Sequence, residues 1–314
     1  MNQIAFLFPG QGSQKVGMGR DIYDTRKTAR EVFDLAEEIT RLPIKKLCFE
    51  GPMEVLTETV NLQPAVTAVN LAFMAILKKE GCVPDYAAGH SLGEYSALCA
   101  SGVLSPANTF RLVLHRGELM HREASRHEGR MSAIIGLSIR EVAALVEKGQ
   151  EWGTVAVANH NMEKQIVITG SPEPVKKVTD LAKSAGAKAV PLKVSGAWHS
   201  DLIRGSVPDF KPLLEKTPFS APELPVVMNV SGQIGTQPEK IRSVMADQLC
   251  SPVRWYDSIQ KLLAEGVDRF VEVGPGKVLT GLLKKIVPKD ASCHIHTVND
   301  LNSLESYIGE IEGK

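Results

Sequence analysis

Short apolar runs alternate along the chain with longer stretches in which apolar residues recur at helical spacing. The first run, residues 4–8, is ended by Pro9 and Gly10, which is typical of a buried parallel strand. Such alternation favours an α/β fold with a mostly parallel, hydrolase-like sheet. The strands expected here are residues 4–8, 225–230 and 269–274, and the helices are residues 25–40, 64–77, 93–102, 108–124, 241–249, 258–266 and 276–286.

The pattern changes in the middle of the chain. A strand, a helix, two strands, a helix and a strand follow one another there, in the β-α-β-β-α-β order of the ferredoxin-like split unit. The segments are residues 131–136, 138–148, 154–159, 164–170, 171–186 and 188–194. We therefore expect a ferredoxin-like subdomain, residues 127–196, inserted into a large α/β domain of residues 1–126 and 197–314.

The composition narrows the class of protein. The 314 residues are 43% hydrophobic and 23% charged, which is ordinary for a globular protein with one large and one smaller domain. Lys plus Arg and Asp plus Glu both number 36, so the net charge of zero predicts no binding to nucleic acid or to an anionic membrane. The longest apolar stretch, residues 64–77, is shorter than the ~20 residues that span a bilayer and contains Asn70, so we expect a buried helix.

The cysteines and histidines give little sign of a metal site or of secretion. Five scattered cysteines with no C-x-x-C pair favour a reducing cytoplasm over a disulfide framework or a zinc site. The N-terminal MNQIAFLFPGQG has no basic region of the kind that opens a signal peptide. His294 and His296 would share one face of a strand, but two ligands without a third are weak grounds for a metal, and we expect none.

Two glycine-rich stretches resemble nucleotide-binding loops only in part. A Walker loop around Gly276 would need a glycine where Val271 stands and a hydroxyl residue where Val278 stands. The stretch PGQGSQKVG has Lys15 where the third glycine of G-x-G-x-x-G belongs. We therefore expect no nucleotide cofactor.

Ser91 is the candidate nucleophile. It lies between Gly89 and Gly93 in AGHSLGEYSAL, after an expected strand and before an expected helix. A nucleophile elbow needs this arrangement, because its sharp turn leaves no room for side chains beside the serine. The helix N-terminus favours developing negative charge, and the Leu92 N–H is a natural oxyanion donor. The alternative is a tight turn in which the serine only caps the helix.

A serine nucleophile needs a base, and His199 in VSGAWHSDLI is the candidate. Asp201 is too close in sequence to be a comfortable triad acid, so a backbone carbonyl could orient the imidazole through Nδ1 instead. His90 adjoins Ser91 and is a minor alternative as the base, because neighbouring side chains usually point apart.

Six segments give the chain a specific resemblance to a known family. FPGQGSQ, GHSLGEYSAL, the arginine of LHRGELM, SGAWHS, QLCSPVRW and EVGPGKVLTGL follow in the order and approximate spacing of malonyl-CoA:acyl carrier protein transacylases. These enzymes of fatty acid synthesis are related to the acyltransferases of polyketide synthases, and the resemblance extends over residues 3–287. It implies malonyl transfer from malonyl-CoA to the phosphopantetheine thiol of an acyl carrier protein through an acyl-serine, with no other cofactor. Members of the family are usually monomers.

The resemblance also implies roles for individual residues. Ser91 resembles the acylated nucleophile, and His199 resembles its base. Gln11 and Leu92 resemble the residues whose N–H groups form the oxyanion hole. Gln248 resembles the residue whose main-chain carbonyl orients the histidine.

Arg116 resembles the arginine that binds the free carboxylate of the substrate. The guanidinium is a rigid, permanently charged fork that matches a carboxylate, which lysine does not offer. Without the carboxylate the buried charge would be unpaired, so the site is expected to discriminate against acetyl groups.

Two positions bear on which acyl group and carrier are accepted. Trp198 stands where malonyl-selective relatives usually carry phenylalanine, and its ring is expected to crowd an α-methyl branch, which favours malonyl over methylmalonyl. Asn161 resembles a residue near the active-site cleft of the family. The following Met162-Glu163-Lys164 departs from the small residue and Pro-Gly usual there, and this different loop chemistry could alter the acyl carrier or the acyl group that is accepted.

Three alternatives remain open from the sequence. A serine hydrolase or thioesterase would use the same elbow and base. A non-catalytic scaffold that binds carrier protein would be expected to lack part of the catalytic pair. A stand-alone acyltransferase of a polyketide or malonate decarboxylase system would use the same chemistry in another pathway.

Overall fold

The large domain is built on one six-stranded sheet in a computed structural model that describes residues 3–313. The strand order is β10-β9-β1-β2-β7-β8, and all neighbours are parallel except β7 and β8. The strands are β1 Gln3–Phe8, β2 Tyr86–Gly89, β7 Val226–Met228, β8 Gln233–Gly235, β9 Val267–Val273 and β10 His294–Val298. The predicted α/β class with a mostly parallel sheet is confirmed.

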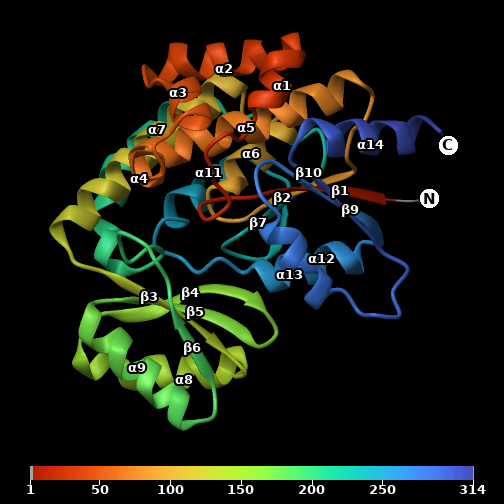
Figure 1. The fold of residues 1–314 in the computed structure, drawn as a ribbon. Coiled ribbons are helices and arrows are strands. Elements are labelled where there is room, and N and C mark those ends of the chain that lie inside the picture. The colour runs from red at the N-terminus through yellow and green to blue at the C-terminus, as the bar shows by residue number, and fades with distance from the viewer. Residues whose placement is uncertain (1–2, 314) are drawn as a thin grey trace.

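Helices cover both faces of this sheet (Figure 1). Because successive side chains of a strand point to opposite faces, Phe6 and Phe8 of β1 pack in one core, and Ala5 and Leu7 pack in the other. Helices α2, α5, α6 and α7 contribute to the first core, and α12 and α13 to the second. The helices of this domain are α1 Arg20–Thr25, α2 Lys27–Thr40, α3 Ile44–Phe49, α4 Met53–Thr57, α5 Thr59–Lys79, α6 Gly93–Ala100, α7 Pro106–Arg126, α10 Val207–Lys216, α11 Pro238–Asp247, α12 Trp255–Ala264, α13 Val278–Ile286, α14 Leu301–Glu312 and the short 3-10 helix η2 Asp201–Ser206.

Helix α5 is the central helix of the first core. It has 21 residues and extends beyond the predicted apolar stretch at both ends, so by length and composition alone the whole helix could cross a membrane. The protein itself buries 83% of its most apolar 18-residue window, which confirms the predicted buried helix. The Nδ2 of Asn70 donates hydrogen bonds there to Pro9 O and Ser96 Oγ, whereas its buried Oδ1 has no partner among the described residues.

The sequence pattern missed several short elements. Helices α3 and α4 have six and five residues, which is too few to display a helical repeat of apolar positions. The single helix predicted for residues 25–40 is preceded by a separate one, since α1 ends at Thr25 and α2 begins at Lys27.

The inserted subdomain has its own antiparallel sheet in the order β4-β5-β3-β6. Its elements are β3 Arg130–Ile135, α8 Ile139–Gly149, η1 Gln150–Trp152, β4 Val155–Met162, β5 Gln165–Gly170, α9 Pro172–Ser184 and β6 Lys188–Pro191. The predicted β-α-β-β-α-β order of elements is present. The last strand is shorter than predicted, because β6 ends at Pro191 and residues 192–195 form no strand.

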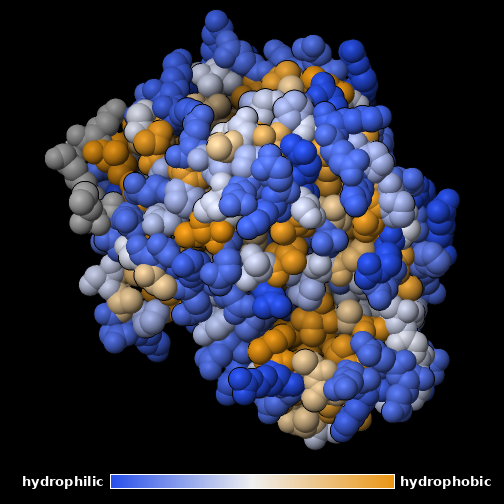
Figure 2. Space-filling view, turned by 180° about the vertical axis from the view of Figure 1, so that it is seen from behind, coloured by the Kyte–Doolittle hydropathy of each residue, from blue (hydrophilic) through white to orange (hydrophobic). Residues whose placement is uncertain are grey.

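The two faces of the subdomain sheet have different partners. One face packs with α8 and α9 around Ile134, Ile166 and Ile168. The other face belongs to the first core of the large domain, through residues such as Met131 and Val167. Figure 2 shows, on the far side of the molecule, apolar side chains gathered where the subdomain meets the large domain. The subdomain therefore packs against the large domain through apolar side chains.

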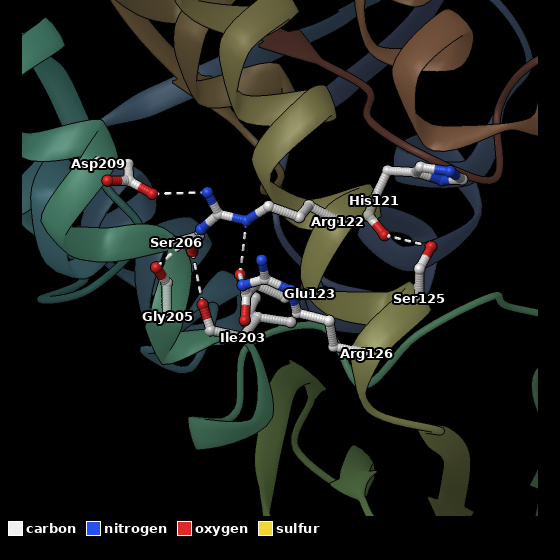
Figure 3. Close-up of polar contacts among 9 residues, drawn as sticks. All are labelled: His121, Arg122, Glu123, Ser125, Arg126, Ile203, Gly205, Ser206 and Asp209. Carbon is white, nitrogen blue, oxygen red and sulfur yellow. Dashed lines mark hydrogen bonds and ion pairs between the residues drawn. The ribbon is translucent and has the colours of Figure 1, made fainter.

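A polar clasp fastens the end of α7, where the chain enters the subdomain, to the segment that returns from it (Figure 3). Arg122 Nη1 lies 2.6 Å from Asp209 Oδ2, and Nη2 donates to Gly205 O at 2.9 Å. Arg122 Nε donates at 2.7 Å to Glu123 Oε1, which also accepts from Arg126 Nη1 at 3.2 Å. Glu123 is only 2% exposed, so the clasp is mostly shielded from water on the carboxylate side.

We expect Glu123→Gln to lower the free energy of unfolding by about 1.5–3 kcal/mol, since the buried carboxylate loses charge-assisted hydrogen bonds to two arginines. Lys176→Ala is the control. It breaks a pair with Asp180 on α9 whose side chains are 76% and 52% exposed, and we expect no measurable change. Urea unfolding of both variants at neutral pH measures the difference. Equal effects would show that the clasp does not stabilise the fold.

Candidate active site

Ser91 occupies a strained turn between β2 and α6. Its φ is 52°, in the left-handed region that a residue with a side chain rarely adopts. A Cβ added to Gly89 would overlap the main chain of Gly93, and a Cβ added to Gly93 would overlap Phe8 O. The glycines at both flanking positions are therefore required by the close approach of β1, β2 and α6.

His199 is placed to remove the proton of Ser91. Its Nε2 lies 2.8 Å from Ser91 Oγ, and its Nδ1 lies 3.1 Å from Gln248 O and 3.0 Å from Ser251 O. Because carbonyl oxygens only accept, Nδ1 carries the hydrogen, and Nε2 is left to accept from the serine. Burial, and then the positive charge of Arg116, lower the pKa of His199 to about 3. The imidazole is therefore neutral near pH 7, as a general base must be.

Arg116 of α7 lies fully inside the protein beside the serine. Its Nη1 donates to Gln63 Oε1 at 2.9 Å, its Nε and Nη2 to Gln248 Oε1 at 3.3 and 3.2 Å, and Nη2 also to Ser91 Oγ at 3.2 Å. The guanidinium lies over the ring of Tyr95. These partners are neutral, and burial lowers the pKa of Arg116. Among the side chains that the structure describes, no carboxylate forms an ion pair with this guanidinium, and the buried Glu94 acts on the pKa of Arg116 only at longer range.

Two main-chain donors line the same cavity. Gln11 and Leu92 border the space over Ser91, and within residues 3–313 neither N–H has a hydrogen-bond partner. Unpaired N–H groups beside a nucleophile are what an oxyanion hole requires.

The cavity over Ser91 continues into a larger cleft between the two domains. The inner cavity has about 110 Å³, and Arg116, Trp198 and His199 are among its walls. The outer cleft has about 350 Å³ and shares Gln11, His90, Asn159, Leu192 and Val194 with the inner one. The outer cleft is further lined by Gln14, Thr57, Asn161, Gln165, Lys193, Val278 and Leu282. A long, thin substrate could therefore reach Ser91 from the domain boundary.

Asn161 and its neighbours form one wall of the cleft. Asn161 Oδ1 lies 2.9 Å from His90 Nε2, so His90 is engaged away from Ser91 Oγ and does not serve as its base. Met162, part of the atypical segment, packs against the second core of the large domain, and Glu163 and Lys164 are exposed at the β4–β5 turn.

Other residues singled out from the sequence lie elsewhere. His294 and His296 are on β10, and His296 Nδ1 faces Glu310 Oε2 of α14 at 3.6 Å. The turn at Gly276 joins β9 to α13. In residues 3–313 no group of three or more His, Cys, Asp or Glu side chains is arranged to hold a metal ion.

Three polar residues of the site were not singled out from the sequence: Gln63, Glu94 and Asn229. Gln63 binds Arg116, and Asn229 accepts the Ser91 N–H on Oδ1 at 2.7 Å. Glu94 lies one turn after Ser91, in GEYS, where a carboxylate inside an otherwise apolar helix could have signalled a buried polar network. Asn229 is 138 positions from Ser91, and no sequence spacing reveals that contact.

Known proteins share both the sequence and this architecture. Residues 5–301 match the family described as acyl transferase domain. A malonyl CoA-acyl carrier protein transacylase of Bacillus subtilis is 44% identical over 288 residues, which are 91% of each chain. A crystal structure of an acyl carrier protein S-malonyltransferase from Vibrio cholerae superimposes with a TM-score of 0.93 at 38% identity, covering 98% of this chain and 100% of that one.

A further solved structure is described as a type II PKS acyl-carrier protein in complex with its malonyl-transacylase. It superimposes with a TM-score of 0.94 at 36% identity and covers 98% of this chain and 100% of that one. The match extends through the large domain, the inserted subdomain and the elbow at Ser91. The chain belongs to the family of malonyl CoA-acyl carrier protein transacylases.

Proposed function

We propose that the protein transfers a malonyl group from malonyl-CoA to the phosphopantetheine thiol of an acyl carrier protein through an acyl-serine. The observation that carries the proposal is a partly buried Ser91–His199 pair with the guanidinium of Arg116 3.2 Å from the same Oγ. The pair supplies acyl transfer, and the arginine supplies recognition of an acyl group that ends in a carboxylate.

In the first half-reaction Ser91 Oγ attacks the thioester carbonyl of malonyl-CoA while its proton passes to His199 Nε2. The N–H groups of Gln11 and Leu92 stabilise the oxyanion. The tetrahedral intermediate collapses with cleavage of the C–S bond, and the proton on His199 leaves with coenzyme A as the free thiol. The malonyl carboxylate, one methylene beyond the ester carbonyl, lies within reach of Arg116.

In the second half-reaction the phosphopantetheine thiol of the carrier attacks the ester on Ser91. His199 accepts the thiol proton and returns it to Ser91 Oγ as the C–O bond breaks. A thioester is consumed and a thioester is formed, so the two half-reactions are chemically alike. No metal, nucleotide or other cofactor takes part in this scheme.

Several features support transfer over hydrolysis. His199 is only 3% exposed, and the inner cavity is small, so an acyl group would fill most of the space beside Ser91. The outer cleft offers a path for a long thiol arm. The scaffold alternative has less support, because Ser91, His199, Gln11 and Arg116 are all in place for chemistry.

The remaining assignments stay proposals. Trp198, in the inner cavity, is proposed to favour malonyl over methylmalonyl, and Asn161 to contact the substrate in the outer cleft. We propose a monomer in the cytoplasm that acts in fatty acid synthesis. Service to a polyketide or malonate decarboxylase system would use the same site, and an assay with carrier proteins of each kind separates these pathways.

Malonyl transfer is expected to depend on the acyl carrier protein. With malonyl-CoA alone, coenzyme A should appear in an amount equal to the enzyme and then stop, because the acyl-serine waits for a second thiol. Addition of holo carrier protein should start steady release of coenzyme A with equal formation of malonyl-carrier. The apo carrier, which lacks the thiol, is the control. Steady release of free malonate that the carrier does not affect would identify a hydrolase.

Arg116→Ala is expected to reduce kcat/KM for malonyl transfer by about 100-fold or more, since it removes charge-assisted hydrogen bonds to the substrate carboxylate. Transfer of acetyl, which has no such carboxylate, should change much less. Arg111→Ala, on the exposed face of the same helix, is the control and should alter neither rate. Parallel assays with malonyl-CoA and acetyl-CoA measure this, and equal losses for both substrates would refute the carboxylate role.

A further inference from the structure

Glu94 holds a carboxylate directly behind the nucleophile, where no water reaches it. It lies in the first turn of α6, and its exposed fraction is 0%. Oε1 accepts the main-chain N–H of Asn229 at 2.8 Å, and Oε2 accepts from Gln248 Nε2 at 2.7 Å. Both carboxylate oxygens are therefore acceptors, and each one fixes a different residue.

The first of these residues, Asn229, brackets the strained turn. Its Oδ1 accepts the N–H of Ser91 at 2.7 Å, and its Nδ2 donates to Gly89 O at 2.6 Å. One side chain thus holds the main chain on both sides of His90. Glu94 fixes the main chain from which that side chain projects.

The second residue, Gln248, contacts Ser91, His199 and Arg116. Its Nε2 donates to Ser91 O at 2.8 Å as well as to Glu94, and its Oε1 accepts from Arg116. Its main-chain carbonyl accepts from His199 Nδ1 at 3.1 Å. A change at Oε2 of Glu94 would therefore alter the positions of Ser91, His199 and Arg116 together, because all three contact Gln248.

The charge around Glu94 comes mainly from one neighbour. Arg116 of α7 is the cation facing it, and Tyr95 of α6 lies against the same guanidinium. His199 and His90 are the other titratable groups of the site. The buried side chains of α5, β1, β2 and β7, which pack against α6, include no acidic or basic residue.

From this network, which the proposed transfer reaction uses, we infer that Glu94 is a positioning residue whose ionised carboxylate holds Ser91, His199 and Arg116 in their reactive arrangement. It touches no substrate atom in the mechanism above. It acts through Asn229 and Gln248, and both contacts are strongest when the carboxylate carries no proton, because an ionised carboxylate only accepts.

The arrangement has a consequence for pH. Burial raises the pKa of Glu94 to about 7, against the lowering effects of the Asn229 N–H, Gln248 and Arg116. As the pH falls through this value the carboxylate gains a proton, and one of its two N–H donors loses its acceptor. Acylation should therefore slow below about pH 7 and reach a plateau above it. His199, with a pKa of about 3, does not titrate in this window.

The contribution of Glu94 to stability has the opposite sign. An acid whose pKa is raised on folding binds its proton more tightly in the native state. That contribution is fully present below the unfolded pKa of about 4.3 and is lost as the pH rises through about 7. Protonation of Glu94 therefore stabilises the fold in the same pH range in which it slows acylation. A carboxylate that only stabilised the fold would leave the acylation rate unchanged in that range.

The test is the pH dependence of Ser91 malonylation by malonyl-CoA, quenched before one turnover and read by intact mass, from about pH 5.5 to about pH 8.5. Measuring acylation alone leaves out the ionisation of the carrier thiol. The wild type should lose rate on the acid side. Glu94→Gln keeps one acceptor and turns an amide N–H toward the other donor, so its rate should be roughly 10- to 100-fold lower at high pH and independent of pH.

Glu272→Gln is the matched control. Glu272 on β9 is also fully buried and accepts two main-chain N–H groups, from Leu279 at 3.0 Å and Thr280 at 2.7 Å, but it contacts none of Ser91, His199 and Arg116. The acylation rate of Glu272→Gln should decline on the acid side as in the wild type. Glu94→Asp keeps a titratable carboxylate on a side chain that is one methylene shorter. Its acylation rate should still decline on the acid side, with a lower plateau at high pH and a shifted midpoint.

The inference would be overturned if the acylation rate of the wild type did not decline on the acid side, or if the decline persisted in Glu94→Gln. If Glu94→Gln does not fold by circular dichroism, Glu94→Asp decides, and a decline with the wild-type midpoint and plateau counts against the inference. Absence of any malonyl adduct on the wild type would contradict the proposed function instead, so the two failures are distinguishable.

Discussion

The sharp turn at Ser91 is the constraint on which the rest of the site depends. A left-handed serine between two glycines presents its hydroxyl above the sheet, and such a conformation persists only where the surroundings hold it. Asn229 and Gln248 hold the main chain of Ser91, and Glu94 holds both of them. The elbow is thus a local turn supported by contacts from two distant parts of the chain, at Asn229 and Gln248.

The same interior produces the electrostatics of the site. Burial keeps the imidazole of His199 neutral, and the adjacent guanidinium lowers its pKa further, so the base is available without a triad carboxylate. Two main-chain carbonyls orient the ring in place of an acid. Arg116 has neutral side-chain hydrogen-bond partners, and the substrate carboxylate is the anion that it is proposed to bind.

The sequence reveals those features that depend on local chemistry. The elbow follows from G-x-S-x-G after a strand, and the subdomain follows from its order of apolar runs, so both could be predicted. The order of strands in the sheet could not, because neighbours such as β1 and β9 are far apart in the chain. Arg116 looks like any arginine of an amphipathic helix, and only the family resemblance pointed to it. The contact of Asn229 with Glu94 spans 135 positions and emerges only when the chain is folded.

The central claim is that Ser91 carries the malonyl group between two thiols. Incubation with malonyl-CoA alone, followed by proteolysis and mass spectrometry of the peptides, tests it most directly. We expect a malonyl ester on Ser91, coenzyme A released in equal amount, and no adduct in Ser91→Ala. No adduct on the wild type, or a malonyl group on any other residue, would contradict it.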